Sequence, residues 1–449
     1  MPMAAPFAST LFVLASLAGS VPSTGDTLLV HDAYVLSMDP AQADIEQGDV
    51  LIRGGRIVAV GTDLAATAGP ARRIDAKGQI VLPGFVDTHS HLYTTLMRGQ
   101  FRNAEGKFFP ESTRLAAAMR AEDVGTAMTL GALQLLEGGI TTTADYFDNI
   151  QSPAHAEAGW KGLQASGISG RMYYGGPDRS TRHPIDTVHL QRMAAAVPSD
   201  SPLQLGLAWR LPRDRQDEAN WAMRQAEFNA ASAAGLPLQV HVSGEPDPMF
   251  QALIERGYLR PGVTVVHATD ARPEQLAALE AAGASLSLTP LSEHRVGYGV
   301  TRVDHFAAVS RRGLGIDGNP LAGSADMYAT LRHAALTWSG GARDETAPDP
   351  RTLLALATRD GARAMGLEKE VGMLRAGMRA NLQIVDPRGL NLAGYGGGDP
   401  AALLVHDVRP DNVSTVIVDG RLIKHEGRML YPQLEQLLQR ADETARRLR

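Results

Sequence analysis

Residues 82–92 read LPGFVDTHSHL, an apolar strand-like run that leads into two histidines two positions apart. Side chains at alternate positions of a strand point to the same side, so we expect His89 and His91 to face one way. The run also marks a change in the pattern of the chain. Short β-patterned runs precede it, and alternating strand-like and helix-like stretches follow it.

The downstream alternation indicates repeated βα units with parallel strands. Eight strand-like runs can be placed, and the span from Pro83 to Gly366 is close to the ~250 residues of a barrel of eight βα units. The runs are GFVDTHSH, TTTADY, GRMYYGG, LQLGLAW, LPLQVHV, VTVVHAT, ASLSLTP and GLGIDG. We therefore predict an α/β fold with a (β/α)8 TIM barrel over residues 83–366.

Two segments that flank the predicted barrel have the pattern of short β-strands. Residues 26–82 contain the pair Gly54-Gly55, and residues 367–430 contain Asp419-Gly420; both pairs favour two-residue hairpin turns. Neither segment alone would bury much apolar surface. We expect the two to combine into one small β-sandwich domain.

The two ends of the chain carry different signals. Residues 1–25 contain an apolar stretch and the small residues Ala18-Gly19-Ser20, as a secretory leader would, but no Lys or Arg precedes Asp26. This segment is interpreted as a leader or an extension, and a cytoplasmic location is slightly favoured over a periplasmic or secreted one. Residues 431–449 carry leucines at helical spacing and predict a packed terminal helix.

The composition is that of a globular protein, and its charge balance fits a small neutral or weakly charged substrate at least as well as a polyanion. Hydrophobic residues make up 44% and charged residues 20%, with a formal net charge of -6. No basic run suggests nucleic acid, and no apolar run is long enough for a membrane span. Cysteine is absent, which excludes thiolate metal sites and cysteine nucleophiles. A small-molecule substrate is expected, and a homo-oligomer is compatible with the sequence.

Histidines and one aspartate stand where predicted barrel strands end. His89 and His91 close the first strand, His241 the fifth, His267 the sixth and Asp317 the eighth. The C-terminal ends of barrel strands meet at one mouth, where catalytic residues gather. One buried histidine is usually structural, and an Asp before Gly is usually a turn former. Their ordered occurrence at several strand ends instead favours a site for a divalent ion.

The run LPGFVDTHSHL resembles the opening motif of the amidohydrolase superfamily, and GITTTADY, GIDG and VGMLRAGMRANLQIVD extend the resemblance over nearly the whole chain. The sequence is most similar to the cytosine deaminase and chlorohydrolase branch. The resemblance implies metal ligands at His89, His91, His241 and Asp317. It also implies a proton-handling or carbonyl-orienting role for His267.

One metal ion per chain is expected, with zinc favoured over iron. Two-metal members of the superfamily usually bridge their ions with a carboxylated lysine near the end of the fourth strand. Here that strand reads LQLGLAWR and contains no lysine. A bound divalent ion would lower the pKa of its water toward ~7. Asp317 would accept that proton and His267 would polarise the atom that gains charge. We therefore expect hydrolytic deamination, or a related C–N displacement, on a heterocyclic small molecule.

The chain departs from the branch at two strands. Deaminases of the branch typically place a glutamate three residues after the fifth-strand histidine. Here that position is Gly244, and Glu245 follows it as a candidate acid. In place of the PxSN motif after the seventh strand, the chain has Glu293 and His294, which are candidates for orienting substrate. Either Glu293 takes over the acid role or it forms a loop ion pair with Arg295. Trp209, at the end of the fourth strand, is a candidate for stacking on a flat substrate.

Two alternatives to deamination stay open. One is hydrolysis of an exocyclic amide, urea or carbamate bond, or of a C–halogen bond. Amide, urea or carbamate hydrolysis would need no acid at a ring nitrogen, and the displaced glutamate favours it mildly. A metal-binding receptor without turnover is the other alternative. Such a receptor would have little use for Asp317 together with His267.

Overall fold

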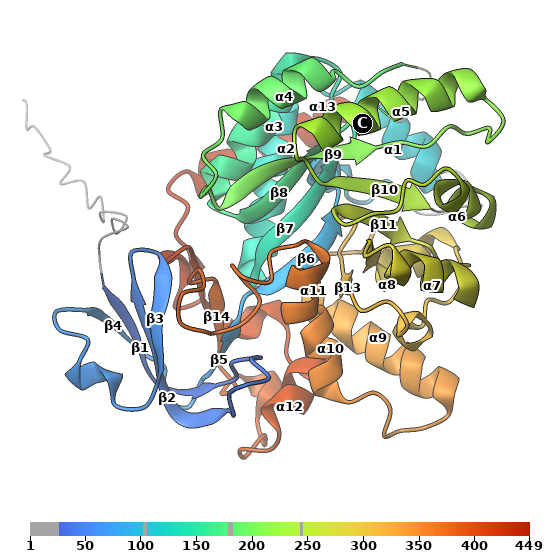
Figure 1. The fold of residues 1–449 in the computed structure, drawn as a ribbon. Coiled ribbons are helices and arrows are strands. Elements are labelled where there is room, and N and C mark those ends of the chain that lie inside the picture. The colour runs from blue at the N-terminus through green and yellow to red at the C-terminus, as the bar shows by residue number, and fades with distance from the viewer. Residues whose placement is uncertain (1–26, 102–105, 178–182, 243–245) are drawn as a thin grey trace, which may run out of the picture.

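The computed structural model describes residues 27–101, 106–177, 183–242 and 246–449, and these residues form two sheets. One sheet has eight parallel strands in chain order, with helices around it, and forms the barrel in Figure 1. Its strands are β6 (Phe85–Ser90), β7 (Ile140–Phe147), β8 (Ser169–Tyr174), β9 (Leu203–Trp209), β10 (Leu238–Val242), β11 (Val263–His267), β12 (Ser285–Leu288) and β13 (Arg312–Leu314). The predicted eight-stranded α/β barrel is confirmed.

Helices follow the strands and cover the outside of the barrel. They are α1 (Phe108–Ala117), α2 (Ala121–Glu137), α3 (Pro153–Ser166), α4 (Thr187–Ala195), α5 (Glu218–Ala233), α6 (Pro246–Glu255), α7 (Pro273–Ala281), α8 (Pro290–Val296), α9 (Met327–Ala342), α10 (Pro350–Leu356) and α11 (Arg359–Ala364). Aspartates begin several of them: the side chains of Asp186, Asp217 and Asp326 accept the backbone N–H three residues on. Such caps satisfy amide groups that have no partner within the helix.

The barrel closes between its first and last strands. Ser90 forms a parallel bridge with Asp317, and the amide of Asp317 donates to the carbonyl of His89 at 2.8 Å. Asp87 reinforces this closure from within β6, since its Oδ1 accepts the amide of Ile316 at 2.9 Å. The same contacts therefore close the barrel and hold the first-strand histidines beside Asp317.

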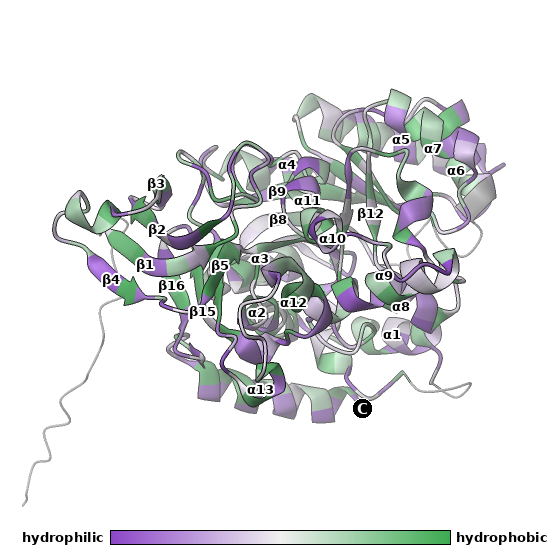
Figure 2. Ribbon diagram, turned by 90° about the horizontal axis from the view of Figure 1, so that it is seen from below, coloured by the Kyte–Doolittle hydropathy of each residue, from purple (hydrophilic) through white to green (hydrophobic). Residues whose placement is uncertain are grey.

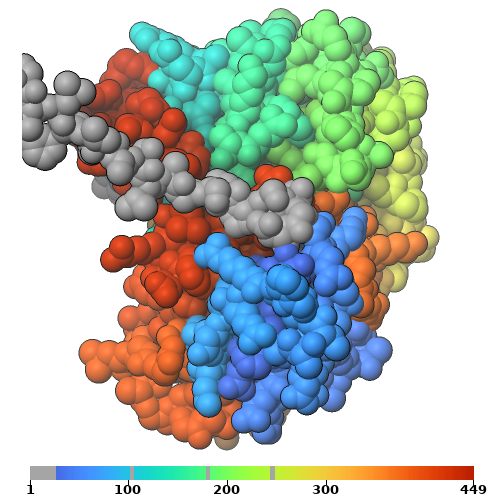
Figure 3. All heavy atoms as spheres, turned by 90° about the vertical axis from the view of Figure 1, so that its left-hand side faces the viewer, coloured from blue at the N-terminus to red at the C-terminus, as the bar shows by residue number. Residues whose placement is uncertain are grey.

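The second sheet joins the two ends of the chain. Its nine strands run in the order β17-β16-β15-β14-β5-β1-β2-β3, with β4 paired to β1, and the two segments meet where β5 pairs antiparallel with β14. The two segments therefore combine as expected, and the strands that they contribute form one continuous sheet. Figure 3 shows the N-terminal strands in blue against the C-terminal part in orange and red. Its strands are β1 (Leu28–Val35), β2 (Ile45–Arg53), β3 (Arg56–Gly61), β4 (Arg72–Asp75), β5 (Ile80–Pro83), β14 (Leu382–Val385), β15 (Val413–Val418), β16 (Arg421–His425) and β17 (Arg428–Met429).

Both predicted hairpin turns are confirmed. Gly54 and Gly55 link β2 to β3 with φ of 57° and 80°, and Asp419 and Gly420 link β15 to β16 with φ of 50° and 75°. These left-handed values are the ones that a two-residue turn between antiparallel strands requires, and glycine adopts them without strain.

Burial of the strands and helices accounts for the stability of this arrangement. Every residue of β7 and β11 is buried, as expected for parallel strands that are covered on both sides. Two further helices, α12 (Pro400–His406) and α13 (Leu434–Leu448), pack on α9 and α2 respectively. Figure 2 shows α13 with alternating polar and apolar residues along its length. Among the described residues, none of the helices combines the length and apolar character needed to cross a membrane.

Candidate metal centre

Three histidine nitrogens converge at the mouth of the barrel. Nε2 of His89 lies 3.1 Å from Nε2 of His91 and 3.1 Å from Nε2 of His241, and the last two are 3.3 Å apart. His89 belongs to β6, His91 follows it directly, and His241 belongs to β10. The three imidazoles that the sequence analysis expected to converge therefore do so, from two separate strands.

The spacing of these nitrogens fits a divalent metal ion. With Zn–N bonds of ~2.0–2.1 Å at tetrahedral angles, two ligand nitrogens lie ~3.3–3.4 Å apart. Asp317 completes the donor set, because its Oδ1 lies 3.6 Å from Nε2 of His91. Three imidazole nitrogens and one carboxylate oxygen are the ligand types that zinc and iron(II) accept.

The opposite nitrogens of two of these rings are hydrogen-bonded to acceptors. Nδ1 of His89 lies 3.0 Å from Oε1 of Gln239, and Nδ1 of His91 lies 3.1 Å from Oδ1 of Asp148. Donation from each Nδ1 leaves the lone pair of Nε2 directed at the point of convergence. Such partners typically fix metal-ligating histidines. Two lone pairs facing each other at 3.1 Å would repel unless a cation lay between them.

The electrostatics favour a cation at this point. Burial and the neighbouring His91 lower the pKa of His89 to about 3, and burial and His89 lower that of His241 well below its usual value. These two rings are therefore neutral, the form that binds metal. Burial opposes the charged form of His91, but Asp148 and Asp317 outweigh it and raise its pKa to about 9. The same carboxylates would favour a metal ion on that nitrogen.

Asp317 reaches the centre through an unusual backbone conformation. It lies three residues beyond β13 and has a φ of 65°, in the left-handed region, as does His267 at 72°. This conformation is uncommon outside glycine, although aspartate and histidine adopt it more readily than most other residues. Burial tends to raise the pKa of Asp317, but the imidazoles of His91, His267 and His89 lower it overall, so its carboxylate is charged.

His267 stands beside the three converging rings. It ends β11, is 4% exposed, and has a ring centroid 5.4 Å from that of His241. One of its ring nitrogens lies within 4.8 Å of ligand nitrogens of His89 and His241. His267 can therefore contact a molecule that reacts at the centre.

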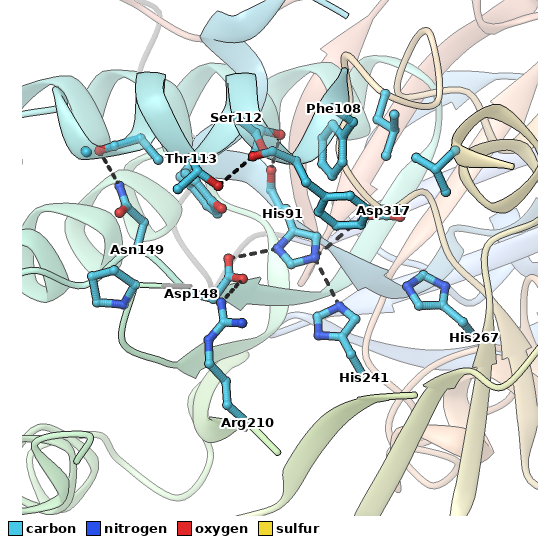
Figure 4. A pocket seen from close by; sticks show the side chains of 18 of the residues that line it. His91, Phe108, Ser112, Thr113, Asp148, Asn149, Arg210, His241, His267 and Asp317 are labelled. Carbon is cyan, nitrogen blue, oxygen red and sulfur yellow. Dashed lines mark hydrogen bonds and ion pairs between the residues drawn. The ribbon is translucent and has the colours of Figure 1, made fainter. Parts of the chain in front are cut away.

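A cavity of about 460 Å³ opens onto this centre. Its volume lies within the ~300–1,000 Å³ range of small-molecule sites. His91, His241, His267 and Asp317 form its floor, while α1 contributes Phe108, Phe109, Ser112 and Thr113 to one wall, as Figure 4 shows in part. The lining also includes Asp148, Asn149, Arg210 and Tyr298.

The chain belongs to the amidohydrolase family. The family profile, described as "Amidohydrolase family", matches residues 80–423, which include all four candidate metal ligands and the whole barrel sheet. The motif LPGFVDTHSHL that opens the barrel therefore identified the family correctly.

Relatives of this amidohydrolase include deaminases of adenine nucleosides. It is 27% identical to 5'-deoxyadenosine deaminase from Methanosarcina mazei, over 94% of this chain and 98% of that protein. It is 29% identical to 5-methylthioadenosine/S-adenosylhomocysteine deaminase from Symbiobacterium thermophilum, over 94% of this chain and 99% of that protein. Family membership and these relatives confirm the predicted enzyme class, a hydrolase that acts on carbon–nitrogen bonds.

A solved structure shares the fold of this amidohydrolase. A zinc-bound adenosine deaminase from Xanthomonas campestris superposes with a TM-score of 0.81 at 22% identity, over 94% of this chain and 98% of that one. An atrazine chlorohydrolase variant from Arthrobacter aurescens, complexed with zinc and atraton, gives 0.80 at 22% identity, over 93% and 100%. Together with the histidine cluster, these zinc-containing structures support a bound metal ion.

Two polar residues of this amidohydrolase site were missed in the sequence. Asp148 follows the end of β7 and Arg210 follows the end of β9, and the guanidinium of Arg210 donates to Oδ2 of Asp148. Both lie just beyond C-terminal strand ends, where functional residues gather in barrels. That position, together with their charge, is the signal that could have found them.

Trp209 does not stack on substrate, so this prediction is wrong. Its side chain is fully buried, its Nε1 donates to the carbonyl of Arg224 at 3.0 Å, and its ring packs against Phe228 and Tyr258. Trp209 alternates with Ala208, which lies in the cluster inside the barrel, so the tryptophan faces the helices.

The two candidates on α8 do not reach the cavity directly. His294 contacts Nε2 of His333 and accepts the amide of Thr301, and neither it nor Glu293 belongs to the cavity lining. The prediction that either side chain orients substrate directly is therefore wrong. Glu293 is fully buried and lies 3.0 Å from Nδ1 of His267, whereas Arg295 donates to the carbonyls of Pro320, Leu321 and Phe101. The predicted role of Glu245 lies outside the described residues.

Proposed function

We propose that this amidohydrolase is a deaminase of adenine nucleosides that carry a modified 5′ position. The observation that carries the proposal is the convergence of three imidazole nitrogens and Asp317 on the floor of a cavity of nucleoside size. The named activities of the two deaminase relatives supply the substrate class.

The metal site would hold one divalent ion, with zinc as the first choice and iron as the second. Its ligands would be His89, His91, His241 and Asp317. When bound, such an ion lowers the pKa of water and so makes a nucleophile available near neutral pH.

Asp317 would carry protons during the reaction. Its carboxylate lines the cavity and its lowered pKa keeps it ionised, so it can accept a proton from the attacking water. After water adds to the carbon that bears the amino group, Asp317 returns the proton to the amino nitrogen. Ammonia then leaves, and the ring carbon that carried the amino group becomes a carbonyl carbon.

His267 would handle protons at the reacting carbon, by accepting a hydrogen bond from the attacking water or from the leaving amino group. It lines the cavity beside Asp317 and within reach of the centre. A hydrogen bond at the reacting atoms is stronger where water is excluded, and His267 is 4% exposed.

The cavity walls suit a flat ring with a polar sugar. Phe108, Tyr298 and Leu321 supply apolar contact area, and Ser112, Asn149 and Arg210 supply hydrogen-bonding groups. A small number of polar groups on an apolar surface is typical of sites that orient a small ligand.

A second candidate function is hydrolysis of an exocyclic amide, urea or carbamate. The position three residues after His241 is Gly244, where deaminases of the branch carry the glutamate that protonates a ring nitrogen. A reaction outside the ring would not need that acid.

Ammonia release and loss of the adenine absorbance test the proposal. The metal-loaded protein is incubated with 5'-deoxyadenosine, 5'-methylthioadenosine, S-adenosylhomocysteine and adenosine, with Asp317→Asn as the inactive control. Turnover of at least one adenine nucleoside is expected. Turnover of aryl amides or ureas with none of any adenine nucleoside would transfer the function to the second candidate.

A further inference from the structure

Glu293 occupies a place that no catalytic role yet explains. Its side chain is exposed neither to solvent nor to the cavity, since it is 0% exposed and absent from the cavity lining. A buried carboxylate is costly unless it is paired and hydrogen-bonded. Among the described residues, its Oε2 has no hydrogen-bond partner, so all of its contacts are made through Oε1.

All hydrogen bonds of Oε1 are made with His267 or with Thr289, the residue that precedes α8. Oε1 lies 3.0 Å from Nδ1 of His267, accepts the amide of Thr289 at 2.8 Å, and accepts the Thr289 hydroxyl at 3.3 Å. That hydroxyl also lies 3.1 Å from Nδ1 of His267. Glu293 and Thr289 thus occupy the Nδ1 edge of the ring, which leaves Nε2 as the nitrogen available to the cavity.

The chemistry of a carboxylate makes this contact directional. An ionised carboxylate can only accept hydrogen bonds, whereas an asparagine or glutamine amide can either accept or donate. Only a proton on Nδ1 of His267 satisfies a carboxylate at this position. An amide nitrogen could not take this place, because Oε1 also accepts the amide of Thr289.

We propose that Glu293 is a positioning residue that holds His267 as the Nδ1–H tautomer, so that its unprotonated Nε2 faces the substrate and the metal centre. The PLSE segment would then serve the site through His267, without touching substrate. The uncommon left-handed φ of 72° at His267 supports this reading, because such a conformation persists where surrounding contacts hold it.

The tautomer can be measured without any substrate. In full-length, zinc-loaded protein labelled with ¹⁵N-histidine, two-bond ¹H–¹⁵N correlations distinguish protonated from unprotonated ring nitrogens, and His267→Asn identifies the His267 signals. We expect Nδ1 protonated and Nε2 unprotonated in the wild type. A proton on Nε2 would overturn the proposal without the need for any variant of Glu293.

The Glu293→Leu variant separates positioning from mere structure. Glu293→Gln, whose amide oxygen can replace Oε1, is the conservative control and should keep the wild-type tautomer. In Glu293→Leu the side chain accepts no hydrogen bond from Nδ1, so we expect the His267 signals to shift toward the Nε2–H form. Retention of the wild-type tautomer in folded Glu293→Leu would contradict the proposal.

The kinetic arm rests on the proposed deaminase function. With the nucleoside turned over fastest, Glu293→Leu should lower kcat by about tenfold or more, as loss of an orienting partner commonly does, with little change in KM, and Glu293→Gln should retain most of the activity. Glu293 does not line the cavity, so a rise in KM with kcat unchanged would argue against a positioning role. His294→Gln is the matched control on the same helix and should leave both the tautomer and kcat near wild type. If no nucleoside is turned over, the proposed function fails while the tautomer measurement still decides the role of Glu293.

Discussion

Oδ1 of Asp148 lies 3.1 Å from Nδ1 of His91, on the side of the ring away from the nitrogens of His89 and His241. The other oxygen of Asp148 accepts a hydrogen bond from Arg210, so the aspartate is held between a histidine and a guanidinium. Asp148 is 7% exposed and lines the cavity. Asp148 and Arg210 thus connect the candidate metal centre to the cavity wall against which a substrate would lie.

Asp148→Asn is expected to weaken metal binding. The amide keeps the shape but removes the charge that favours a cation on His91, and loss of such outer partners typically costs ~10–100-fold in metal affinity. Competition with a chromophoric chelator measures the change. Asp349→Asn is the control, since Asp349 is an exposed helix cap that accepts the amide of Thr352. Equal metal affinity in both variants would remove Asp148 from the support of the centre.

Asp317→Asn is expected to lose turnover while the protein stays folded. Asparagine tolerates the left-handed φ of 65°, and its side-chain oxygen can still accept the amide of Gly318, which lies 2.8 Å from Oδ1. Removal of a general base commonly costs ~10²–10⁴-fold in rate. Steady-state kinetics and thermal melting are measured together. Residual activity near that of the wild type would exclude Asp317 as the proton carrier.

Glu245→Gln tests the acid whose position follows Gly244. If Glu245 protonates a ring nitrogen, the variant should lower kcat for adenine nucleosides by ~10²-fold or more. Activity on an exocyclic amide should be spared, because that reaction needs no ring protonation. An unchanged rate on nucleosides would place Glu245 on the loop surface.

Trp209→Phe is expected to affect stability and not substrate binding. The variant loses the hydrogen bond to Arg224 and part of the packing against Tyr258, which together are worth about 1–3 kcal/mol. Urea unfolding measures the stability, and KM for the best substrate is the comparison. A severalfold rise in KM with unchanged stability would show that Trp209 contributes to substrate binding after all.

The barrel could be predicted because its signals are local. Strand-like runs such as VTVVHAT are short and apolar, and each is followed by a helical stretch, so their order along the chain specifies parallel strands. The candidate ligands could be predicted for the same reason. A histidine at the end of a barrel strand lies at the common mouth whatever the details of the packing.

The partners of those ligands depend on tertiary packing and were harder to predict. Glu293 approaches His267 only because α8 turns back over the end of β11, and nothing in the spacing of the two residues reveals that contact. Trp209 is different, since a signal was available. Leu203, Leu205 and Leu207 share its face of β9, and this continuous apolar face indicates packing against helices.

Metal analysis of the purified protein tests the central claim most directly, namely that the nitrogens of His89, His91 and His241 meet around one ion. We expect about one equivalent of zinc or iron per chain, loss of turnover on chelation, recovery on readdition of the metal, and loss of bound metal in His241→Ala. A metal-free protein that is fully active and indifferent to chelators would contradict the account.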